Sequence, residues 1–407
     1  MTLSIDGQLT ILMRGVDYGD PQIYAHMRQE LAERLTESAR TGTPLRVYCG
    51  YDPTSPDLHL GHTVTMRKLR QFQELGHQVI FVIGTYTALI GDLSDKDKAR
   101  PRPEKARILE NARTYAEQAF RILDQERTEV RYNGDWLSQL SFEDIVGLAS
   151  NFTVQQFLVR DNFAKRYEQG DPIWLHEFLY ALMQGYDAVA LQADVQLGGT
   201  EQLFNLMAGR KLQETFGQRP QIVLTTPILV GTDGHIRMAK SIGNYIGISE
   251  PPEAMYGKVM SLPDSAMGNY CNLVTRWTPA QIADIEGQLQ SGALHPMDAK
   301  KQLAAEIVSV FYGDEAAREA AAHFERVHQQ RQMPAEIAAY AFAGPMRLTD
   351  LIAEAGLAPS KSQARRLIQQ GGVRLDDVVV EDIEMLVAPA GQILQVGKRY
   401  FLRLQRL

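Results

Sequence analysis

The first 230 residues alternate short apolar segments with longer amphipathic ones, and this alternation constrains the fold more than any other feature. Helical periodicity separates the apolar segments, notably over residues 61–75 and 103–123. Such alternation predicts an α/β domain in which helices cover both faces of a parallel sheet. The predicted strands are residues 45–49, 79–83, 129–132, 193–197 and 222–224. Ligands of such sheets bind at the carboxyl ends of the strands, so polar residues just after a strand are the first candidates for a site.

The rest of the chain follows a different pattern. A long helical insertion is predicted between the third and fourth strands, over about residues 142–191. From about residue 250 to residue 342 the periodicity is helical only, and Ala343-Gly344-Pro345 reads as a linker. Two short helices and a small β segment are expected after the linker. We therefore expect an α/β domain over residues 1–245, an α-helical domain over 246–342 and a small α+β domain over 343–407.

The composition fits an ordinary globular protein, with 44% hydrophobic and 22% charged residues in a chain of 407. No segment approaches the roughly 20 uninterrupted apolar residues of a membrane span, so no membrane association is expected. The N-terminus lacks the basic and apolar regions of a signal peptide. The two cysteines, Cys49 and Cys271, argue against a disulfide framework and against a cysteine-rich metal site. We expect a cytoplasmic protein without a protein-held metal ion.

Two short segments far apart in the chain carry residues suited to handling ATP. The first, Pro56-Asp57-Leu58-His59-Leu60-Gly61-His62, lies where a strand should give way to a helix. The second, Arg237-Met238-Ala239-Lys240-Ser241, lies on a loop. Imidazoles at i and i+3 of a helix start place N–H donors beside the positive end of the helix, and a loop lysine can close over pyrophosphate. Either segment alone is weak evidence, because loop histidines are more often solvated or structural.

Together the two segments resemble the signature motifs of class I aminoacyl-tRNA synthetases. Further segments narrow the resemblance to the bacterial tyrosyl-tRNA synthetases, and the segment after the linker resembles their S4 RNA-binding domain. These further segments are Tyr48-Cys49-Gly50-Tyr51-Asp52-Pro53-Thr54, Leu89-Ile90-Gly91-Asp92, Tyr180-Ala181-Leu182-Met183-Gln184-Gly185-Tyr186-Asp187 and Gln196-Leu197-Gly198-Gly199-Thr200-Glu201-Gln202. The resemblance implies a Rossmann-like catalytic domain, a helical domain for the anticodon region and an S4-like tail. It implies an enzyme that forms tyrosyl-adenylate from L-tyrosine and ATP with Mg²⁺, esterifies tRNA(Tyr) and forms a homodimer through the helical insertion.

The resemblance also implies roles for individual residues. The tyrosine phenol would be bound by Tyr48 and Asp187, the α-ammonium by Asp92, Tyr180 and Gln184, and the carboxylate region by Gln202. The nucleotide would be lined by Cys49, Gly50, Asp52, Gly61, Gly199 and Glu201. The pyrophosphate would be stabilised by Thr54, His59 and Lys240, while His62 would help seat the adenosine. The spacing i, i+4, i+7 of Tyr180, Gln184 and Asp187 places them on one helix face, although a buried tyrosine beside a solvated aspartate would show the same spacing.

Several departures and alternatives stay open. The second motif of the family usually has lysine and serine where this chain has Arg237 and Ala239, and Thr200-Glu201 stands where many relatives have Ser-Asp. Asp92 could be a simple helix cap, and Cys49 a buried small apolar residue. A tryptophan-specific synthetase is the alternative enzyme, which Tyr48, Asp187 and the S4-like tail argue against. An RNA-binding paralogue with a decayed active site is the alternative of another class.

The net charge of −7 is unevenly distributed. Residues 344–407 carry nine Lys/Arg against seven Asp/Glu, which leaves −9 for the remainder. A basic module at the end of an acidic chain favours contact with nucleic acid there. We expect tRNA to be bound by Lys361, Arg365 and Arg366 on a predicted helix and by Arg374 on the following strand. A solvated charged helix would be the simpler interpretation of these residues alone.

Overall fold

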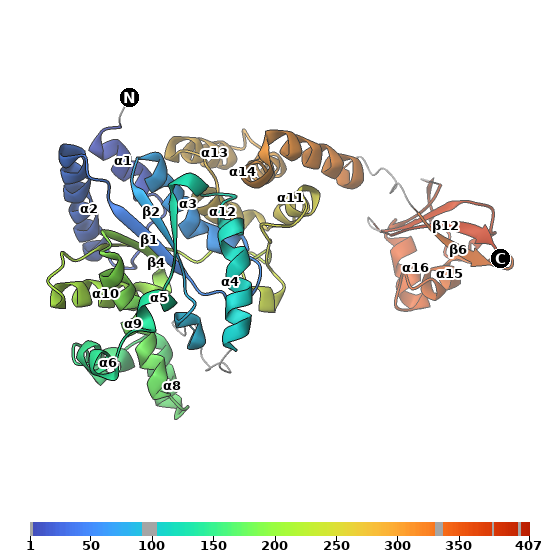
Figure 1. The fold of residues 1–407 in the computed structure, drawn as a ribbon. Helices are drawn as coiled ribbons and strands as arrows, with labels where there is room; N and C mark the ends of the chain where they lie inside the picture. Colours follow the sequence, from blue (N-terminus) through green and yellow to red (C-terminus); the bar gives the residue numbers. More distant parts are fainter. Residues whose placement is uncertain (1–2, 92–103, 330–336, 377, 398–399) are drawn as a thin grey trace. The chain divides into compact units, whose positions relative to one another are not determined.

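Five strands form a wholly parallel sheet in the order β3-β2-β1-β4-β5 (Figure 1). These strands are β1 (Arg46–Tyr51), β2 (Gln78–Ile83), β3 (Thr128–Tyr132), β4 (Val195–Gly199) and β5 (Ile222–Thr226). Each begins within two residues of its predicted start, so the α/β prediction is confirmed. The order reverses between β1 and β4, and the carboxyl end of such a reversal is where ligands of parallel sheets bind.

The computed structural model describes residues 3–91, 104–329, 337–376, 378–397 and 400–407. Contacts divide the chain into two compact units, Met1–Arg318 and Glu319–Leu407. Residues 246–318 lie within the first unit, which also contains the parallel sheet. The division into three domains at residues 246 and 343 stays a prediction. No helix in the described part of the chain is long and apolar enough to cross a membrane.

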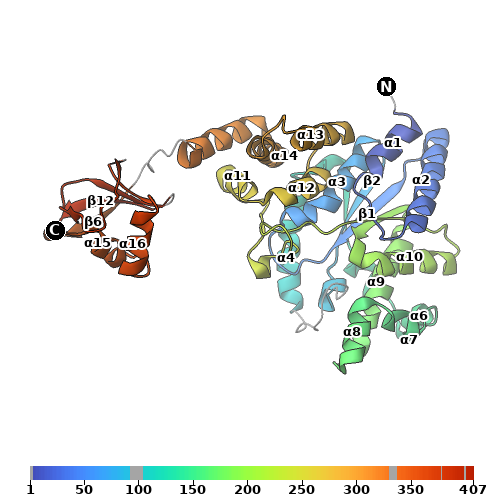
Figure 2. The same ribbon diagram turned by 180° about the vertical axis from the view of Figure 1, so that it is seen from behind.

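Helices cover both faces of the parallel sheet (Figures 1 and 2). On one face, α3 (Leu60–Glu74) packs on β1, and the Tyr51 hydroxyl lies 2.8 Å from Thr65 Oγ1 of this helix. On the other face, Tyr48 packs against Ala188 and Leu191 of α9 (Leu175–Leu191). Because side chains alternate along a strand, residues of β1 contact both helices. The remaining cover is α4 (Lys105–Ala119), packed on β2, and α10 (Leu203–Thr215), packed on α9, β4 and β5.

The insertion predicted over residues 142–191 is confirmed as a run of helices that ends in α9. Phe157 and Phe163 pack with Ala181 and Leu182 of α9 in a buried apolar cluster, which holds the two helices that carry these phenylalanines against α9. A buried ion pair between Arg166 and Glu177, 2.6 Å apart, joins the same elements. The shorter helices of the insertion are α6 (Phe142–Ala149), α7 (Val154–Leu158) and α8 (Asp161–Gln169), and α5 (Gly134–Leu137) precedes it.

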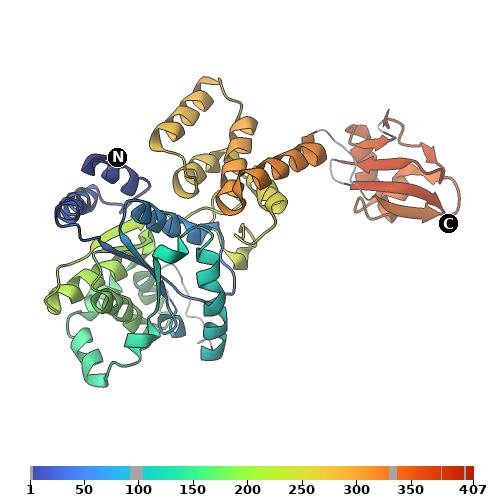
Figure 3. The ribbon, with the colours of Figure 1, turned by 45° about the horizontal axis from the view of Figure 1, so that its top comes forward.

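Helices before and after the sheet complete the first unit (Figure 3). α12 packs against α3 and against α13, so this helical region lies beside the helix that His59 caps. The α-helices concerned are α1 (Ile5–Leu12), α2 (Pro21–Thr41), α11 (Pro252–Met260), α12 (Met267–Val274), α13 (Pro279–Ser291) and α14 (Pro296–Phe324), whose last residues pass the end of the unit at Arg318. The short helical turns of this unit are η1 (Thr87–Leu89), η2 (Gln125–Arg127), η3 (Thr200–Gln202), η4 (Lys240–Ile242) and η5 (Asp264–Ala266), while η6 (Glu325–Gln329) belongs to the second unit.

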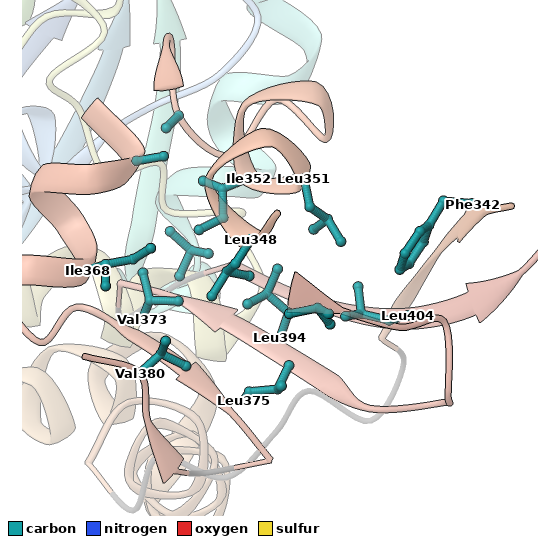
Figure 4. Packing of buried hydrophobic residues seen from close by; sticks show 14 residues of the cluster. Phe342, Leu348, Leu351, Ile352, Ile368, Val373, Leu375, Val380, Leu394 and Leu404 are labelled. Atoms are coloured by element: carbon teal, nitrogen blue, oxygen red, sulfur yellow. The ribbon is translucent and has the colours of Figure 1, made fainter. Parts of the chain in front are cut away.

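The second unit packs two helices on a small sheet of order β6-β12-β11-β8-β9. Leu348, Leu351 and Ile368 of the helices meet Val373 and Leu394 of the strands in one buried core (Figure 4). The helices are α15 (Leu348–Glu354) and α16 (Lys361–Gln369). The strands are β6 (Ala338–Phe342), β8 (Val373–Leu375), β9 (Val378–Val379), β11 (Ile393–Val396) and β12 (Tyr400–Arg406), with a separate pair β7 (Met346–Arg347) and β10 (Leu386–Val387).

Strand β6 corrects the expectation that residues up to 342 are helical. Its residues Ala338–Phe342 pair in parallel with Leu402–Arg406 of β12. Phe342 is 7% exposed and belongs to the core of the second unit. An Ala-rich segment takes a strand conformation here because a distant partner supplies the hydrogen bonds, and local periodicity carries no trace of that partner.

Candidate active site

A cavity of about 470 Å³ opens at the carboxyl ends of β1 and β4, where the strand order reverses. It is lined by β1 and the loop after it, the first turns of α3, the end of β4, the loop between β5 and η4, and one residue of α9. Most of the predicted site residues reach this cavity. They are Cys49, Gly50, Asp52, Thr54, His59, Gly61, His62, Tyr180, Gly199, Glu201, Gln202, Arg237 and Lys240.

The paired histidines cap the first turn of α3. His59 is the N-cap residue, and its Nδ1 accepts a hydrogen bond of 3.1 Å from the Gly61 backbone N–H. His62 Nδ1 in turn accepts one of 3.2 Å from the His59 backbone N–H. A Cβ on Gly61 would lie 2.9 Å from His59 Cε1, so a side chain there would disturb the cap. Because both Nδ1 atoms accept, the neutral rings carry their protons on Nε2 and remain donors.

Both imidazoles stay neutral at physiological pH. Burial, with the neighbouring His62 and Lys240, lowers the pKa of His59 to about 2. Burial lowers the pKa of His62 to about 4, although its hydrogen bond with the His59 backbone opposes the shift. The ring centroids lie 4.0 Å apart. The pair therefore presents two neutral N–H donors at the positive end of a helix, which suits an anionic ligand.

The loop that carries Lys240 is organised by a residue that sequence reasoning missed, Asn244. Its side-chain Oδ1 accepts from the Ala239 N–H at 2.9 Å, and its Nδ2 donates to the Arg237 carbonyl at 3.0 Å and to the Asp233 carboxylate. Gly231 lies so close to this amide that any Cβ there would clash with it. Asn244 is 5% exposed and holds Arg237 and Ala239 of the second motif from inside the loop. The signal that could have found it is an amide shortly after a Lys-Ser turn.

Lys240 joins the second motif to the first. Its Nζ donates to the Asp57 carbonyl at 2.8 Å and lies 3.2 Å from Asp57 Oδ2. The Tyr245 ring lies beside the same cation, with its centroid 5.9 Å from Nζ. Backbone hydrogen bonds also join the two regions, from Leu60 N–H to the Ile246 carbonyl at 2.9 Å. The two motifs, predicted to act together from opposite parts of the chain, lie on one cavity.

Small residues let polar groups approach the nucleotide side of the cavity closely. The Glu201 carboxylate lies directly over Gly199, where any Cβ would clash with it. Gln202 Oε1 accepts from the Gly199 N–H at 3.1 Å, which fixes the turn after β4. Cys49 is 4% exposed, and burial raises the pKa of its thiol to about 11. It is therefore a buried thiol and not a thiolate nucleophile, as the alternative interpretation held.

The two outer members of the set Tyr180, Gln184 and Asp187 on α9 reach different parts of the site. The Tyr180 hydroxyl donates to Asp52 Oδ2 at 3.0 Å, which joins α9 to the end of β1. Gln184 Oε1 accepts from Asn205 Nδ2 at 3.1 Å and does not line the cavity. Asp92, predicted to bind the α-ammonium, lies outside the described residues.

Asp187 is a deeply buried carboxylate with two donors that sequence reasoning missed. Trp136 Nε1 donates to its Oδ1 at 2.7 Å, and Asn133 Nδ2 donates to its Oδ2 at 3.3 Å. Burial raises the pKa of Asp187 to about 8, against the opposing effect of these two hydrogen bonds. The Tyr48 side chain is fully buried nearby, and the Asp187 charge contributes to raising its pKa. Neither Tyr48 nor Asp187 lines the cavity, so the predicted phenol-binding pair lies outside its lining.

The position of Asn133 gave a usable signal. Asn133 follows β3 directly, as Asp52 follows β1, and both therefore lie at the carboxyl edge of the sheet. Polar residues at that edge are the expected ligand-side residues of a parallel sheet. Trp136 gave no such signal, because a tryptophan on a short helix packs against the core in many proteins.

Three of the predicted RNA-binding residues are exposed on one short helix of the second unit. Lys361, Arg365 and Arg366 lie on α16, whose apolar residues Ala364 and Ile368 face the core. Lys361 Nζ lies 3.1 Å from Asp350 Oδ1. Arg374 is half-buried within β8. Among the described residues of the whole chain, no group of three or more His, Cys, Asp or Glu side chains is placed to hold a metal ion.

A parallel sheet of reversed order, a histidine pair at a helix start and a lysine loop across the cavity define a class I aminoacyl-tRNA synthetase. Residues 40–329 match the family model "tRNA synthetases class I (W and Y)", and residues 346–393 match the S4 domain. The "Tyrosine--tRNA ligase" of Moorella thermoacetica is 50% identical over 98% of this chain and 95% of its own length. That of Thermotoga maritima is 49% identical over 92% and 93%. The chain belongs to the tyrosine–tRNA ligases, which confirms the resemblance.

Solved structures agree on the fold. The tyrosyl-tRNA synthetase of Archaeoglobus fulgidus complexed with L-tyrosine has a TM-score of 0.60 at 24% identity, covering 78% of this chain and all of that one. A C-terminally truncated mitochondrial tyrosyl-tRNA synthetase of Aspergillus nidulans has a TM-score of 0.63 at 22% identity, covering 79% and 94%. At this identity the likeness supports the architecture alone.

Proposed function

We propose that this chain activates L-tyrosine with ATP, releasing pyrophosphate, and transfers tyrosine from the adenylate to the 3′ end of tRNA(Tyr). One observation carries the choice of substrates: a buried carboxylate, Asp187, lies on α9, the helix that supplies Tyr180 to the cavity bordered by His59, His62 and Lys240. The cavity has the donors and cations that a nucleotide needs. The Asp187 carboxylate has the acceptor that a phenol needs.

The chemistry depends on where negative charge develops. When a carboxylate attacks the α-phosphorus of ATP, charge spreads over the departing pyrophosphate, and donors aimed at that charge accelerate the step. The neutral Nε2–H groups of His59 and His62 and the Lys240 ammonium border the same space, with Thr54 and Arg237 beside them. Cys49, Gly50, Asp52, Gly61, Gly199 and Glu201 would line the nucleotide. Mg²⁺ would be held chiefly by the phosphates, because it binds readily through substrate phosphates and water.

Amino-acid selection would depend on Asp187 and Tyr48. Trp136 and Asn133 already donate to Asp187, and a phenol hydroxyl would add a third donor. A substrate without a hydroxyl would leave this buried carboxylate short of that partner, which is costly. Tyr180, Gln184, Asp92 and Gln202 would hold the ammonium and carboxylate groups, as the family resemblance implies.

The direct test is ATP–pyrophosphate exchange with single amino acids. Tyrosine should support exchange, while phenylalanine and tryptophan should not at equal concentration. Exchange that prefers tryptophan would favour the alternative synthetase. Absence of exchange with tyrosine, in a protein that still binds RNA, would favour a paralogue with a decayed active site.

We also propose that the chain forms a homodimer through the insertion. Seven large apolar side chains between residues 142 and 175 are more than half exposed, which is unusual for a surface that stays in water. They are Phe142, Val146, Val154, Val159, Tyr167, Trp174 and Leu175. A neighbouring cavity of about 580 Å³ is lined mainly by apolar residues, including Leu137, Leu140 and Leu148. A second copy of the chain is the occupant that the family resemblance implies.

Sedimentation equilibrium tests the dimer. Val159→Glu with Leu175→Glu should shift the protein from dimer to monomer at micromolar concentration. Met297→Glu is the matched control, because Met297 is 42% exposed but lies on α14, away from the insertion in sequence. A monomeric wild-type protein, or unchanged dimerisation in the double variant, would contradict this proposal.

The remaining assignments follow from the same family. The S4-like unit would bind tRNA through Lys361, Arg365, Arg366 and Arg374, and the helices after residue 246 would serve the anticodon region. Cys49 and Cys271 are both unpaired and buried, which suits a reducing compartment such as the cytoplasm.

A further inference from the structure

A series of buried and part-buried hydrogen bonds runs along the carboxyl edge of the sheet, from the nucleotide side to the phenol side. Thr87 Oγ1 donates to Asp52 Oδ1 at 2.7 Å. Asn133 Nδ2 donates to Thr87 Oγ1 at 2.9 Å and to Asp187 Oδ2 at 3.3 Å. Asp52, Thr87 and Asn133 follow β1, β2 and β3, and these strands are neighbours in that order. The connection therefore follows from the strand order.

The donor and the acceptor of each hydrogen bond in this series can be assigned. The Asn133 amide oxygen accepts from the Tyr86 N–H at 2.9 Å, so its nitrogen must face Thr87 and Asp187. The Thr87 hydroxyl accepts from that nitrogen, so its single proton is free to go to Asp52. Thr87 is 3% exposed and Asn133 is 1% exposed, so water does not readily replace either bond.

The backbone at the end of β2 is shaped for this contact. Gly84 lies beneath Asp52 and Thr87, and any Cβ on it would clash with Asp52 Oδ1 and with Thr87 Oγ1. The missing side chain lets the carboxylate and the hydroxyl meet above the strand end. The charge of Asp52 also contributes to raising the pKa of Asp187, which shows that the two carboxylates interact electrostatically.

We propose that Thr87 is a positioning residue that holds the nucleotide half and the tyrosine half of the site in register. It orients Asp52 on one side and Asn133, and through it Asp187, on the other. Thr87 does not border the cavity at the ends of β1 and β4 and needs no contact with ATP. The inference rests on the proposed function, because it assigns Asp52 to the nucleotide and Asp187 to the phenol.

The consequence is specific: one hydroxyl outside the cavity should affect the binding of both substrates. Thr87→Val keeps the size of the side chain but removes both hydrogen bonds. Losing a bond to a charged group should weaken tyrosine binding and ATP binding each by about tenfold or more. Thr87→Ser keeps the hydroxyl and should bind both within about threefold of wild type.

Thr85 provides a matched control in the same loop. Thr85 Oγ1 accepts from the Gly134 N–H at 3.2 Å, and the residue is 8% exposed. No hydrogen bond found among the described residues links it to Asp52 or Asn133. Thr85→Val therefore removes a buried hydroxyl without cutting the proposed connection. It should lower thermal stability as Thr87→Val does, but leave both affinities within about threefold.

The experiment is equilibrium binding of tyrosine without ATP, and of a non-hydrolysable ATP analogue without tyrosine, to the four full-length proteins. The inference would be supported if Thr87→Val weakens the binding of both ligands while Thr87→Ser and Thr85→Val bind both about as tightly as the wild type. Weakening of one ligand only, or equal effects in both valine variants, would overturn it. If Thr87→Val does not fold, Thr87→Ala replaces it with the same expectations. Failure of the wild type to activate tyrosine would instead refute the proposed function.

Discussion

Lys240 Nζ lies 3.2 Å from Asp57 Oδ2, so the cation of the second motif is held by a residue of the first. The Lys240 side chain is 25% exposed, and that of Asp57 is 63% exposed. An ion pair this open to water is weak and is easily exchanged for a stronger anion. A pyrophosphate group in the cavity carries more negative charge than Asp57. Lys240 already lines this cavity, so its side chain can exchange Asp57 for the pyrophosphate.

Lys240→Ala should lower tyrosine activation about a hundredfold or more while leaving tyrosine affinity nearly unchanged. The cation is expected to act as pyrophosphate charge develops, so its loss appears in kcat and less in ground-state binding. Pre-steady-state adenylate formation and equilibrium tyrosine binding separate the two effects. Lys258→Ala is the control, because Lys258 lies by the same Tyr245 ring but pairs with Glu250 at 2.7 Å. Adenylate formation within a few-fold of wild type would refute the role of Lys240.

Asp187→Asn should cripple tyrosine binding. Tyr48→Phe should erode the preference for tyrosine over phenylalanine by the worth of one neutral hydrogen bond, about 1 kcal/mol. The physical reason is that a phenol hydroxyl fills the remaining acceptor capacity of a buried carboxylate. Exchange kinetics with each amino acid give the preference as a ratio of kcat/KM. An unchanged ratio in both variants would reopen the tryptophan alternative.

Tyrosine affinity should rise with pH up to about 8. Burial raises the pKa of Asp187 to about 8, so the free enzyme must lose a proton there before the carboxylate can accept from the phenol. The dissociation constant should therefore fall by up to about tenfold per pH unit between pH 6 and 8 and then level off. The same shift means that the contribution of Asp187 to stability is lost as pH rises from about 4 to about 8, because the folded state keeps a proton that the unfolded state releases.

Fluorescence titration of tyrosine at several pH values checks the affinity, and urea unfolding checks the stability. Asp187→Asn lacks the titrating group and should remove the stability slope due to this residue. A flat affinity profile in the wild type would mean that Asp187 is ionised throughout or does not meet the phenol.

Arg365→Ala with Arg366→Ala should weaken tRNA binding and leave tyrosine activation intact. Both side chains are exposed on α16, and each lost phosphate contact should reduce the salt slope of binding by about one. Filter binding across a range of salt concentrations gives the slope. Arg347→Ala is the control, because its guanidinium is paired with Glu384 at 2.7 Å. An unchanged slope in the double variant would place the tRNA elsewhere.

The sequence predicted those features that depend on residues close together in the chain. Short apolar segments of the sequence predicted the five strands. The resemblance of two motifs to those of a known family predicted that His59 and Lys240 share one site, and both line one cavity. The partners of Asp187 could not be predicted in the same way, because Asn133 lies 54 residues away in sequence and meets it through tertiary packing. Strand β6 was missed for the same reason, since its hydrogen bonds come from β12.

Asn244 and Thr87 are residues whose roles the sequence does not predict. Each side chain matters through the backbone or carboxylate that it orients, and residue type alone does not reveal such a role. The rule that ligands bind at the carboxyl edge of a parallel sheet does predict that residues near Thr87 belong to the site. It does not say which of the residues after β2 is connected to both halves of the site.

Aminoacylation of purified bacterial tRNA(Tyr) and tRNA(Trp) with labelled tyrosine tests the central claim most directly. The account predicts that the full-length protein charges tRNA(Tyr) with tyrosine in the presence of ATP and Mg²⁺, and that tRNA(Trp) accepts none. Lys240→Ala should lose this charging at the activation step, with no labelled adenylate formed beforehand. A wild-type protein that folds and binds tyrosine but leaves tRNA(Tyr) uncharged, or that charges tRNA(Trp) instead, would contradict the account.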